Sequence, residues 1–226
     1  MTVERDAAAL DALRAAEIPR WRQGAERTRR LSAQQRQLYR WILREFAAAT
    51  PPSGEATRAA ADALGLDAAE TFHVLAREDL IHVDAVGRPL VAYPFSAKPR
   101  GHRVLIEAER TVEAMCAIDA LGIAPMLGLP IEIYSRDPFS GGEIWVRLDP
   151  SEGAWWEPQQ AVVLTGSACC DGPSFRGCCD VLNFFETAAN ADRYLREHFE
   201  IQATVISIPE AIEAGRTVFG DALKED

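Results

Sequence analysis

Residues 80–94 mark the change from helical to strand-like spacing in this chain. The stretch reads Leu80-Ile81-His82-Val83-Asp84-Ala85-Val86-Gly87-Arg88-Pro89-Leu90-Val91-Ala92-Tyr93-Pro94. Two short apolar runs flank a turn that contains Gly87, which predicts a β-hairpin. The apolar spacing before this stretch is helical, and many of the apolar runs after it have the length of strands. We therefore expect an α+β protein.

Three helices are predicted before the hairpin. Ser32 is a cap for the first helix, which ends before Pro51, and Ser53 is a cap for a short Ala-rich helix. Asp67 starts the third helix, with Glu70 in a capping-box position. Three helices followed by a hairpin is the order of a winged helix-turn-helix. Such a unit either packs and dimerises or reads DNA, and the near balance of 12 basic and 13 acidic residues in 1–84 favours packing.

The charge distribution divides the chain into two parts. Residues 85–226 carry 12 basic and 21 acidic side chains and all five cysteines. A Pro- and Gly-containing linker is expected at 95–102. We expect a helical arm at 1–31, a winged-helix-like domain at 32–97, and a domain that mixes sheet and helix at 98–226.

The second part is expected to alternate strands and helices. A helix over Thr111–Leu121 is predicted from its apolar positions, closed by Gly122 and Pro125. The predicted strands are Arg103–Glu107, Ile131–Tyr134, Glu143–Leu148, Ala161–Leu164, Val181–Phe185 and Ala203–Ile208. Further helices are predicted over Ala191–Phe199 and from Pro209 onward.

Composition excludes several classes of protein. The chain has 226 residues, of which 48% are hydrophobic and 26% charged, as in a globular protein. No apolar run reaches the roughly 18–20 residues of a membrane span, and the start lacks the layout of a signal peptide. We therefore expect a cytoplasmic protein without a membrane partner. The formal charge of −10 argues against nucleic acid as a general partner, because binding phosphates requires a positive surface.

Common catalytic motifs are missing from the sequence. The four histidines (His73, His82, His102 and His198) have no metal-ligand spacing. There is no phosphate-binding glycine loop, and Gly166-Ser167 lacks the second glycine of a nucleophile elbow. Cysteine and carboxylate chemistry remains.

Cys116 and Asp119 are the first candidate pair. On the predicted helix their three-residue spacing places both on one face, about 5–6 Å apart at Cβ. A soft sulfur would then lie beside a proton carrier. The alternative is that Cys116 is a small buried hydrophobe, although a buried Asp119 would still need a partner or a task.

Two vicinal pairs, Cys169-Cys170 and Cys178-Cys179, are the second candidate group. Structural disulfides are rare in a reducing compartment, so these thiols indicate a soft-metal or redox site. The alternatives for Cys178-Cys179 are a vicinal disulfide or inert core thiols. The pair Cys169-Cys170 lies in a predicted loop and would relay metal or oxidise.

Three segments of the chain resemble the organomercurial (alkylmercury) lyase family. Cys116-Ala117-Ile118-Asp119-Ala120-Leu121 is similar to that family's Cys-Ala-x-Asp-x-Leu helix. Cys178-Cys179 precedes Phe184-Phe185 as in the family, and the chain closes with Ile206-Ser207-Ile208-Pro209-Glu210-Ala211. The resemblance covers residues 32–215 and implies a lyase-like domain at 98–226.

The resemblance implies roles for particular residues. It places the two catalytic cysteines on Cys116 and Cys179 and the proton-handling carboxyl on Asp119. Cys178 is the alternative for the second thiol, because one extra residue separates the pair from the aromatics; Cys178, Cys169 and Cys170 are further candidate metal ligands. The family's additional, non-catalytic cysteine is absent here, and its place falls near Asp137.

The expected reaction follows from the chemistry of mercury. Thiolates outcompete nitrogen and oxygen ligands for this soft metal, and a neighbouring carboxylic acid can protonate the leaving carbon. The products would be a hydrocarbon and Hg(II), with no cofactor required. External thiols, or a thiol-bearing acceptor such as a mercuric reductase, would remove the Hg(II). The alternative is a non-enzymatic soft-metal carrier or a metal-responsive regulator that uses the cysteine pairs.

Overall fold

The N-terminal part of the computed structural model is helical. The model describes residues 26–167 and 179–225. A 3₁₀ turn, η1 (Arg27–Arg30), precedes three helices, α2 (Ala33–Ala47), α3 (Gly54–Ala63) and α4 (Ala68–Arg77). Ser32, Ser53 and Asp67 each accept a backbone N–H with their side chains at the helix starts. The three predicted caps are therefore confirmed; of the predicted helical arm at 1–31, residues 1–25 lie outside the described ranges.

A large antiparallel sheet forms the frame of the molecule. Its strands, in spatial order, are β1 (Ile81–Val83), β2 (Pro89–Ala92), β3 (Phe95–Ser96), β5 (Arg110–Ala114), β4 (Arg103–Ile106), β6 (Ile131–Arg136), β7 (Glu143–Asp149) and β8 (Gly153–Glu157). The predicted hairpin is the β1–β2 pair. The α+β expectation is confirmed.

The sheet continues through the segment that was expected to be a linker. β3 pairs with β2 on one side and with β5 on the other. Phe95 is fully buried and stacks near Phe46 of α2. The linker prediction for 95–96 was therefore wrong, because the apolar Phe95 is held in the core by pairing on both sides.

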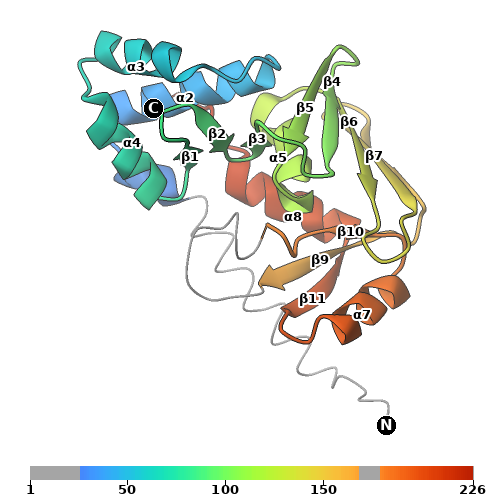
Figure 1. Ribbon diagram of the computed structural model, residues 1–226. Helices are drawn as coiled ribbons and strands as arrows, with labels where there is room; N and C mark the ends of the chain where they lie inside the picture. The colour runs from blue at the N-terminus through green and yellow to red at the C-terminus, as the bar shows by residue number, and fades with distance from the viewer. Residues whose placement is uncertain (1–25, 168–178, 226) are drawn as a thin grey trace.

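Two helices lie between the large sheet and a smaller one. The smaller sheet has the order β10 (Phe184–Phe185), β9 (Val162–Ser167), β11 (Gln202–Ser207). Helix α5 (Ala117–Leu127) contacts β5, β6 and β7, whereas α8 (Ile208–Phe219) contacts β9 and β11. Figure 1 shows α5 and α8 side by side at the centre, and α7 (Ala188–Glu197) beside the smaller sheet. The packed pair of α5 and α8 therefore connects the two sheets.

The helix predicted over Thr111–Leu121 begins later than expected. Residues 110–114 form β5, which pairs with β4 from Arg103 to Ile106. The β-branched Thr111 and Val112 suit a strand, and pairing with β4 decides the outcome. The helix runs on through Gly122 and Pro125 and ends at Gly128, which adopts a left-handed conformation.

Smaller differences concern the ends of other elements. Only Phe184 and Phe185 of the strand predicted over Val181–Phe185 form a ladder, and α7 begins at Ala188 rather than Ala191. Helix α8 begins at Ile208, one residue before Pro209, because Ser207 and Glu210 form a capping box. Strand β8 was not predicted at all.

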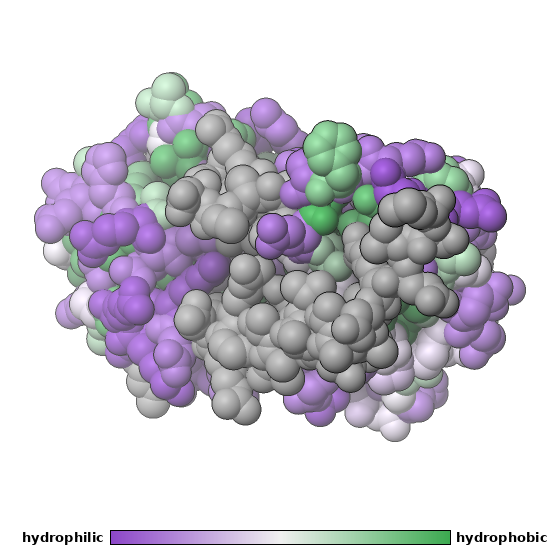
Figure 2. Space-filling view, turned by 90° about the horizontal axis from the view of Figure 1, so that it is seen from below, coloured by the Kyte–Doolittle hydropathy of each residue, from purple (hydrophilic) through white to green (hydrophobic). Residues whose placement is uncertain are grey.

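The face of the molecule that Figure 2 shows is mostly polar in its described part. Seen from below, hydrophilic residues dominate the described area and apolar residues lie in small groups (Figure 2). Within residues 26–167 and 179–225, no helix combines the length and the apolar character that crossing a bilayer requires.

Candidate thiol and carboxyl site

Cys116 lies at the junction between β5 and α5. It is the N-cap residue of α5, and its Sγ accepts a hydrogen bond from the Asp119 backbone N–H at 3.4 Å. This position is usually taken by Ser, Thr, Asp or Asn. The thiol is thus held by the start of the helix, and Asp119 is brought to it by the first turn.

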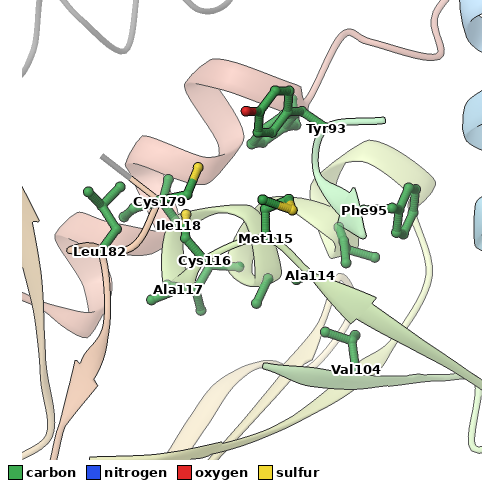
Figure 3. Packing of buried hydrophobic residues seen from close by; sticks show 14 of the residues in the cluster. Tyr93, Phe95, Val104, Ala114, Met115, Cys116, Ala117, Ile118, Cys179 and Leu182 are labelled. Carbon is green, nitrogen blue, oxygen red and sulfur yellow. The ribbon is translucent and has the colours of Figure 1, made fainter. Parts of the chain in front are cut away.

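Cys179 reaches the same place from a distant segment. Its Sγ lies 3.8 Å from Asp119 Oδ2, while Cys116 Sγ lies 2.7 Å from that oxygen. One ligand atom from each of the three residues lies within 4.8 Å of the others. Figure 3 shows the side chains of Cys116 and Cys179 next to each other among apolar neighbours. The structure therefore brings together the three residues that the sequence singled out.

A backbone hydrogen bond joins the two cysteine segments. The Ala117 N–H, next to Cys116, donates to the Leu182 carbonyl at 2.8 Å. A second tether comes from the hairpin side, where the Met115 N–H donates to the Pro94 carbonyl at 3.0 Å. The relative position of the two thiols is consequently set by main-chain geometry.

Burial controls the protonation of the site. Cys116, Asp119 and Cys179 are 2%, 4% and 5% exposed. Burial raises the pKa of Cys116 to about 12, although the hydrogen bond with Cys179 acts in the opposite direction. Burial likewise raises the pKa of Asp119 to about 7, against the lowering effects of Cys116 and of the Arg27 charge. Near neutral pH the resting Cys116 thiol is protonated and Asp119 populates both of its forms.

The helical part of the chain completes the surroundings of the site. Tyr39 of α2 donates its hydroxyl to the Tyr93 carbonyl at 2.8 Å, and Tyr93 lies near Met115 in Figure 3. Arg27 pairs with Asp79 at 3.2 Å, and both charges act on Asp119. The spacing of residues in the sequence does not predict that this helical part lies near the site. The four residues concerned lie 26–92 positions away from Asp119 in the chain.

Asp137, near which the family's additional cysteine would fall, has a structural role in this protein. Asp137 is 1% exposed and accepts hydrogen bonds from Phe139 N and Ser140 N in its own turn. Its other oxygen accepts from Glu186 N at 2.9 Å and Asn190 Nδ2 at 2.7 Å. This carboxylate joins the β6–β7 turn to α7.

The remaining candidates divide into two groups. Cys169, Cys170 and Cys178 lie outside the described residues. Within the described ranges, His73, His82, His102 and His198 belong to no cluster of potential metal ligands.

Two buried thiols that share one carboxyl, in a mixed α+β fold, form a candidate soft-metal site. The family model for alkylmercury lyase matches residues 95–220. The chain therefore belongs to the alkylmercury lyase family, as its motifs indicated, and is an enzyme of that type.

Two relatives support this assignment and the fold. The alkylmercury lyase of Staphylococcus epidermidis (strain ATCC 12228 / FDA PCI 1200) is 26% identical over 179 residues, covering 79% of this chain and 80% of that protein. The crystal structure of the mercury-bound form of MerB2 has a TM-score of 0.75 at 20% identity and covers 90% of this chain and 98% of that one. This likeness confirms the fold.

Proposed function

We propose that the protein cleaves the carbon–mercury bond of organomercurials by protonolysis. The observation that carries this proposal is the position of Asp119 Oδ2, which lies 2.7 Å from one thiol sulfur and 3.8 Å from the other. A single carboxyl can therefore exchange protons with both mercury ligands.

The reaction begins with capture of the substrate cation R–Hg⁺. Cys116 forms a sulfur–mercury bond and gives its proton to the Asp119 carboxylate. Cys179 adds as the second thiolate and also loses its proton. Two soft thiolates on mercury push electron density toward the carbon and weaken the mercury–carbon bond.

Protonation of the carbon completes the cleavage. Asp119, as a carboxylic acid, transfers a proton to the carbon while the mercury–carbon bond breaks, and the hydrocarbon R–H leaves. Of the two thiol protons, one ends on the hydrocarbon and the other is released. Hg(II) stays on the two sulfurs. A pKa of about 7 for Asp119 suits a group that must accept and deliver a proton in one cycle.

Release of Hg(II) requires competing thiols. We propose that small external thiols, or a thiol-bearing acceptor such as a mercuric reductase, take the ion from the two sulfurs. No cofactor is needed for the cleavage itself, because the three side chains supply both ligands and the proton.

The test is release of Hg(II) and hydrocarbon from phenylmercury in excess thiol. Asp119→Asn is expected to lower the rate at least about a hundredfold, since general acid catalysis contributes roughly 10²–10⁴-fold. The matched control is Asp192→Asn, which changes an exposed carboxylate on α7 and should leave the rate unchanged. Wild-type activity in Asp119→Asn would contradict the mechanism.

The carrier and regulator alternatives are not favoured. If the protein were a carrier that binds metal through its vicinal cysteine pairs, the buried Asp119 beside the sulfurs of Cys116 and Cys179 would have no function. We propose Cys178, Cys169 and Cys170 as further candidate ligands of mercury. We also propose that the protein is cytoplasmic.

We also propose the domain division 1–31, 32–97 and 98–226, with a winged-helix-like unit in the middle. The order of α2, α3, α4 and the β1–β2 hairpin supports the winged-helix unit. The start of the family match at residue 95 supports a boundary near this point.

A further inference from the structure

A cavity of about 600 Å³ lies at one end of strands β4, β6 and β7. Its wall includes the chain just before β4, the rings of Tyr134 and Trp145, and Asn183 from the turn between Cys179 and β10. Sites for small molecules usually have a volume of roughly 300–1,000 Å³. The cavity is therefore large enough for a small organic ligand, and it borders the segment that carries the second thiol.

Three arginines line this cavity, in a chain whose formal charge is −10. Arg136 is neutralised by Glu143, with 2.7 Å between Nη2 and Oε1. Arg103 has no ion-pair partner in the described part of the chain, and its guanidinium lies 5.0 Å from the centroid of the Tyr134 ring. A guanidinium stacked on an aromatic ring keeps its N–H donors available for a carboxylate.

Arg100 joins the cavity to the turn of Cys179. Its Nη2 is paired with Asp180, the residue that follows Cys179, and its Nε is buried without a hydrogen-bond partner within residues 26–167 and 179–225. Glu113, the second acid of the wall, accepts the main-chain N–H of Arg100 at 3.0 Å. A ligand carboxylate in place of the exposed Asp180 carboxylate would bind Nε and Nη2 together, which is the bidentate geometry typical of arginine.

We infer that this cavity binds the carboxylate groups of a small thiol, and that this thiol is the acceptor that takes Hg(II) from the protein. The inference deepens the proposed function and rests on it, because an acceptor is needed only if Hg(II) stays on Cys116 and Cys179. Arg100 and Arg103 would hold the thiol at the turn that carries one of the two mercury ligands. Its effective concentration beside the ion is thereby raised.

Transfer of the ion consists of two ligand exchanges, without oxidation or reduction. In the first, mercury forms a bond to the sulfur of the incoming thiol while its bond to Cys179 breaks, and the proton of the incoming thiol passes to the Cys179 sulfur. A second molecule of the thiol replaces Cys116 in the same way. Hg(II) leaves with two small thiolates, and both cysteines are thiols again.

The first experiment measures binding of S-methylglutathione, which has two carboxylates and no free thiol, by tryptophan fluorescence, since Trp145 lines the cavity. Arg103→Gln is expected to weaken binding about tenfold, the effect of losing one hydrogen bond to a charged group. Arg100→Gln should weaken it by a similar factor. The matched control Arg147→Gln changes an arginine of β7 that lies outside the cavity wall and pairs with Glu152, and it should leave binding unchanged.

The second experiment loads the protein with the mercuric ion and follows its removal by glutathione and by glutathione diethyl ester, in which both carboxylates are masked. The mercury content of the protein after rapid gel filtration gives the two rates. Their ratio, compared between variant and wild type, cancels the different reactivities of the two thiols. Arg103→Gln should lower the ratio of the glutathione rate to the ester rate about tenfold, whereas Arg147→Gln should not change it.

Two results would overturn the inference. One is an affinity for S-methylglutathione that is the same in wild type, Arg103→Gln and Arg100→Gln, or no binding to any of them. The other is an unchanged rate ratio in Arg103→Gln, which would show that the bound carboxylates play no part in removing Hg(II). Neither measurement involves carbon–mercury cleavage. Wild-type protein that passes both tests but releases no hydrocarbon from phenylmercury would refute the proposed cleavage alone.

Discussion

Asp119 shows how one residue combines a functional need with a cost in stability. It lies in the first turn of α5, where the helix N-terminus favours a negative charge. Burial nevertheless dominates and raises its pKa to about 7. The residue is thereby suited to proton transfer, and its ionised form is unfavourable in the folded protein.

This cost predicts a pH-dependent effect of Asp119→Asn on stability. The pKa of Asp119 is higher in the folded protein than in the unfolded chain, where it is 3.8. The stabilising effect of the protonated acid is therefore complete below about pH 4, and it is lost as the pH rises to about 7, by about 4 kcal/mol in all. Asp119→Asn does not titrate, so its stability relative to wild type should rise between pH 4.5 and pH 8.

Urea unfolding at these two pH values measures the effect. Asp192→Asn, on the surface, should show a change of less than about 0.5 kcal/mol. An equal difference between Asp119→Asn and wild type at both pH values would contradict the pKa assigned to Asp119.

At the scale of elements, the close contact between α5 and α8 sets the position of α5, which carries Cys116 and Asp119 at its start. Gly122 and Gly215 face each other, and a Cβ on Gly215 would lie 2.8 Å from Gly122 N and 3.0 Å from the Ile118 carbonyl oxygen. Both obstacles are main-chain atoms that cannot rotate away. The two glycines let the helices approach, and α5 carries Cys116 and Asp119 at its start.

Gly215→Ala should therefore force the two helices apart. The expected loss is about 1–3 kcal/mol in the free energy of unfolding, as for overpacked cores. Chemical denaturation measures it, with Glu213→Ala on the exposed side of the same helix as control. A stability equal to wild type would show that α8 shifts without cost.

At the scale of the whole molecule, one sheet runs through both proposed domains. β3 joins the hairpin of the N-terminal unit to β5, and the Tyr39 hydroxyl reaches the Tyr93 carbonyl from α2. The site lies where this sheet, α5 and the smaller sheet meet. The N-terminal unit therefore supports the site directly.

A chain shortened to residues 98–226 should not fold cooperatively. It would lose the partner strand of β5 and leave an unpaired sheet edge beside the site. Thermal unfolding followed by circular dichroism should show a broad transition, whereas residues 26–226 should unfold sharply. A sharp transition in the shorter chain would show that the lyase-like domain folds independently.

Local signals in the sequence were sufficient for much of the fold. The caps at Ser32, Ser53 and Asp67 depend on residues within one helical turn, so spacing alone predicts them. The first part of the helix predicted over Thr111–Leu121 was wrong, because the apolar pattern there suits a helix and a strand equally and pairing with β4 decided between them. Phe95 was misassigned for the same reason.

The candidate site divides in a similar way. The sequence by itself determined the chemistry, because two soft thiols and a carboxyl restrict the reactions available, and the Cys116–Asp119 spacing places this pair in one helical turn. Only the tertiary structure decided that Cys179 joins them from 60 residues away, and that burial brings the pKa of Asp119 to about 7. The physical reason is that burial and contacts between distant segments are properties of the packed chain, which no local pattern of residues contains.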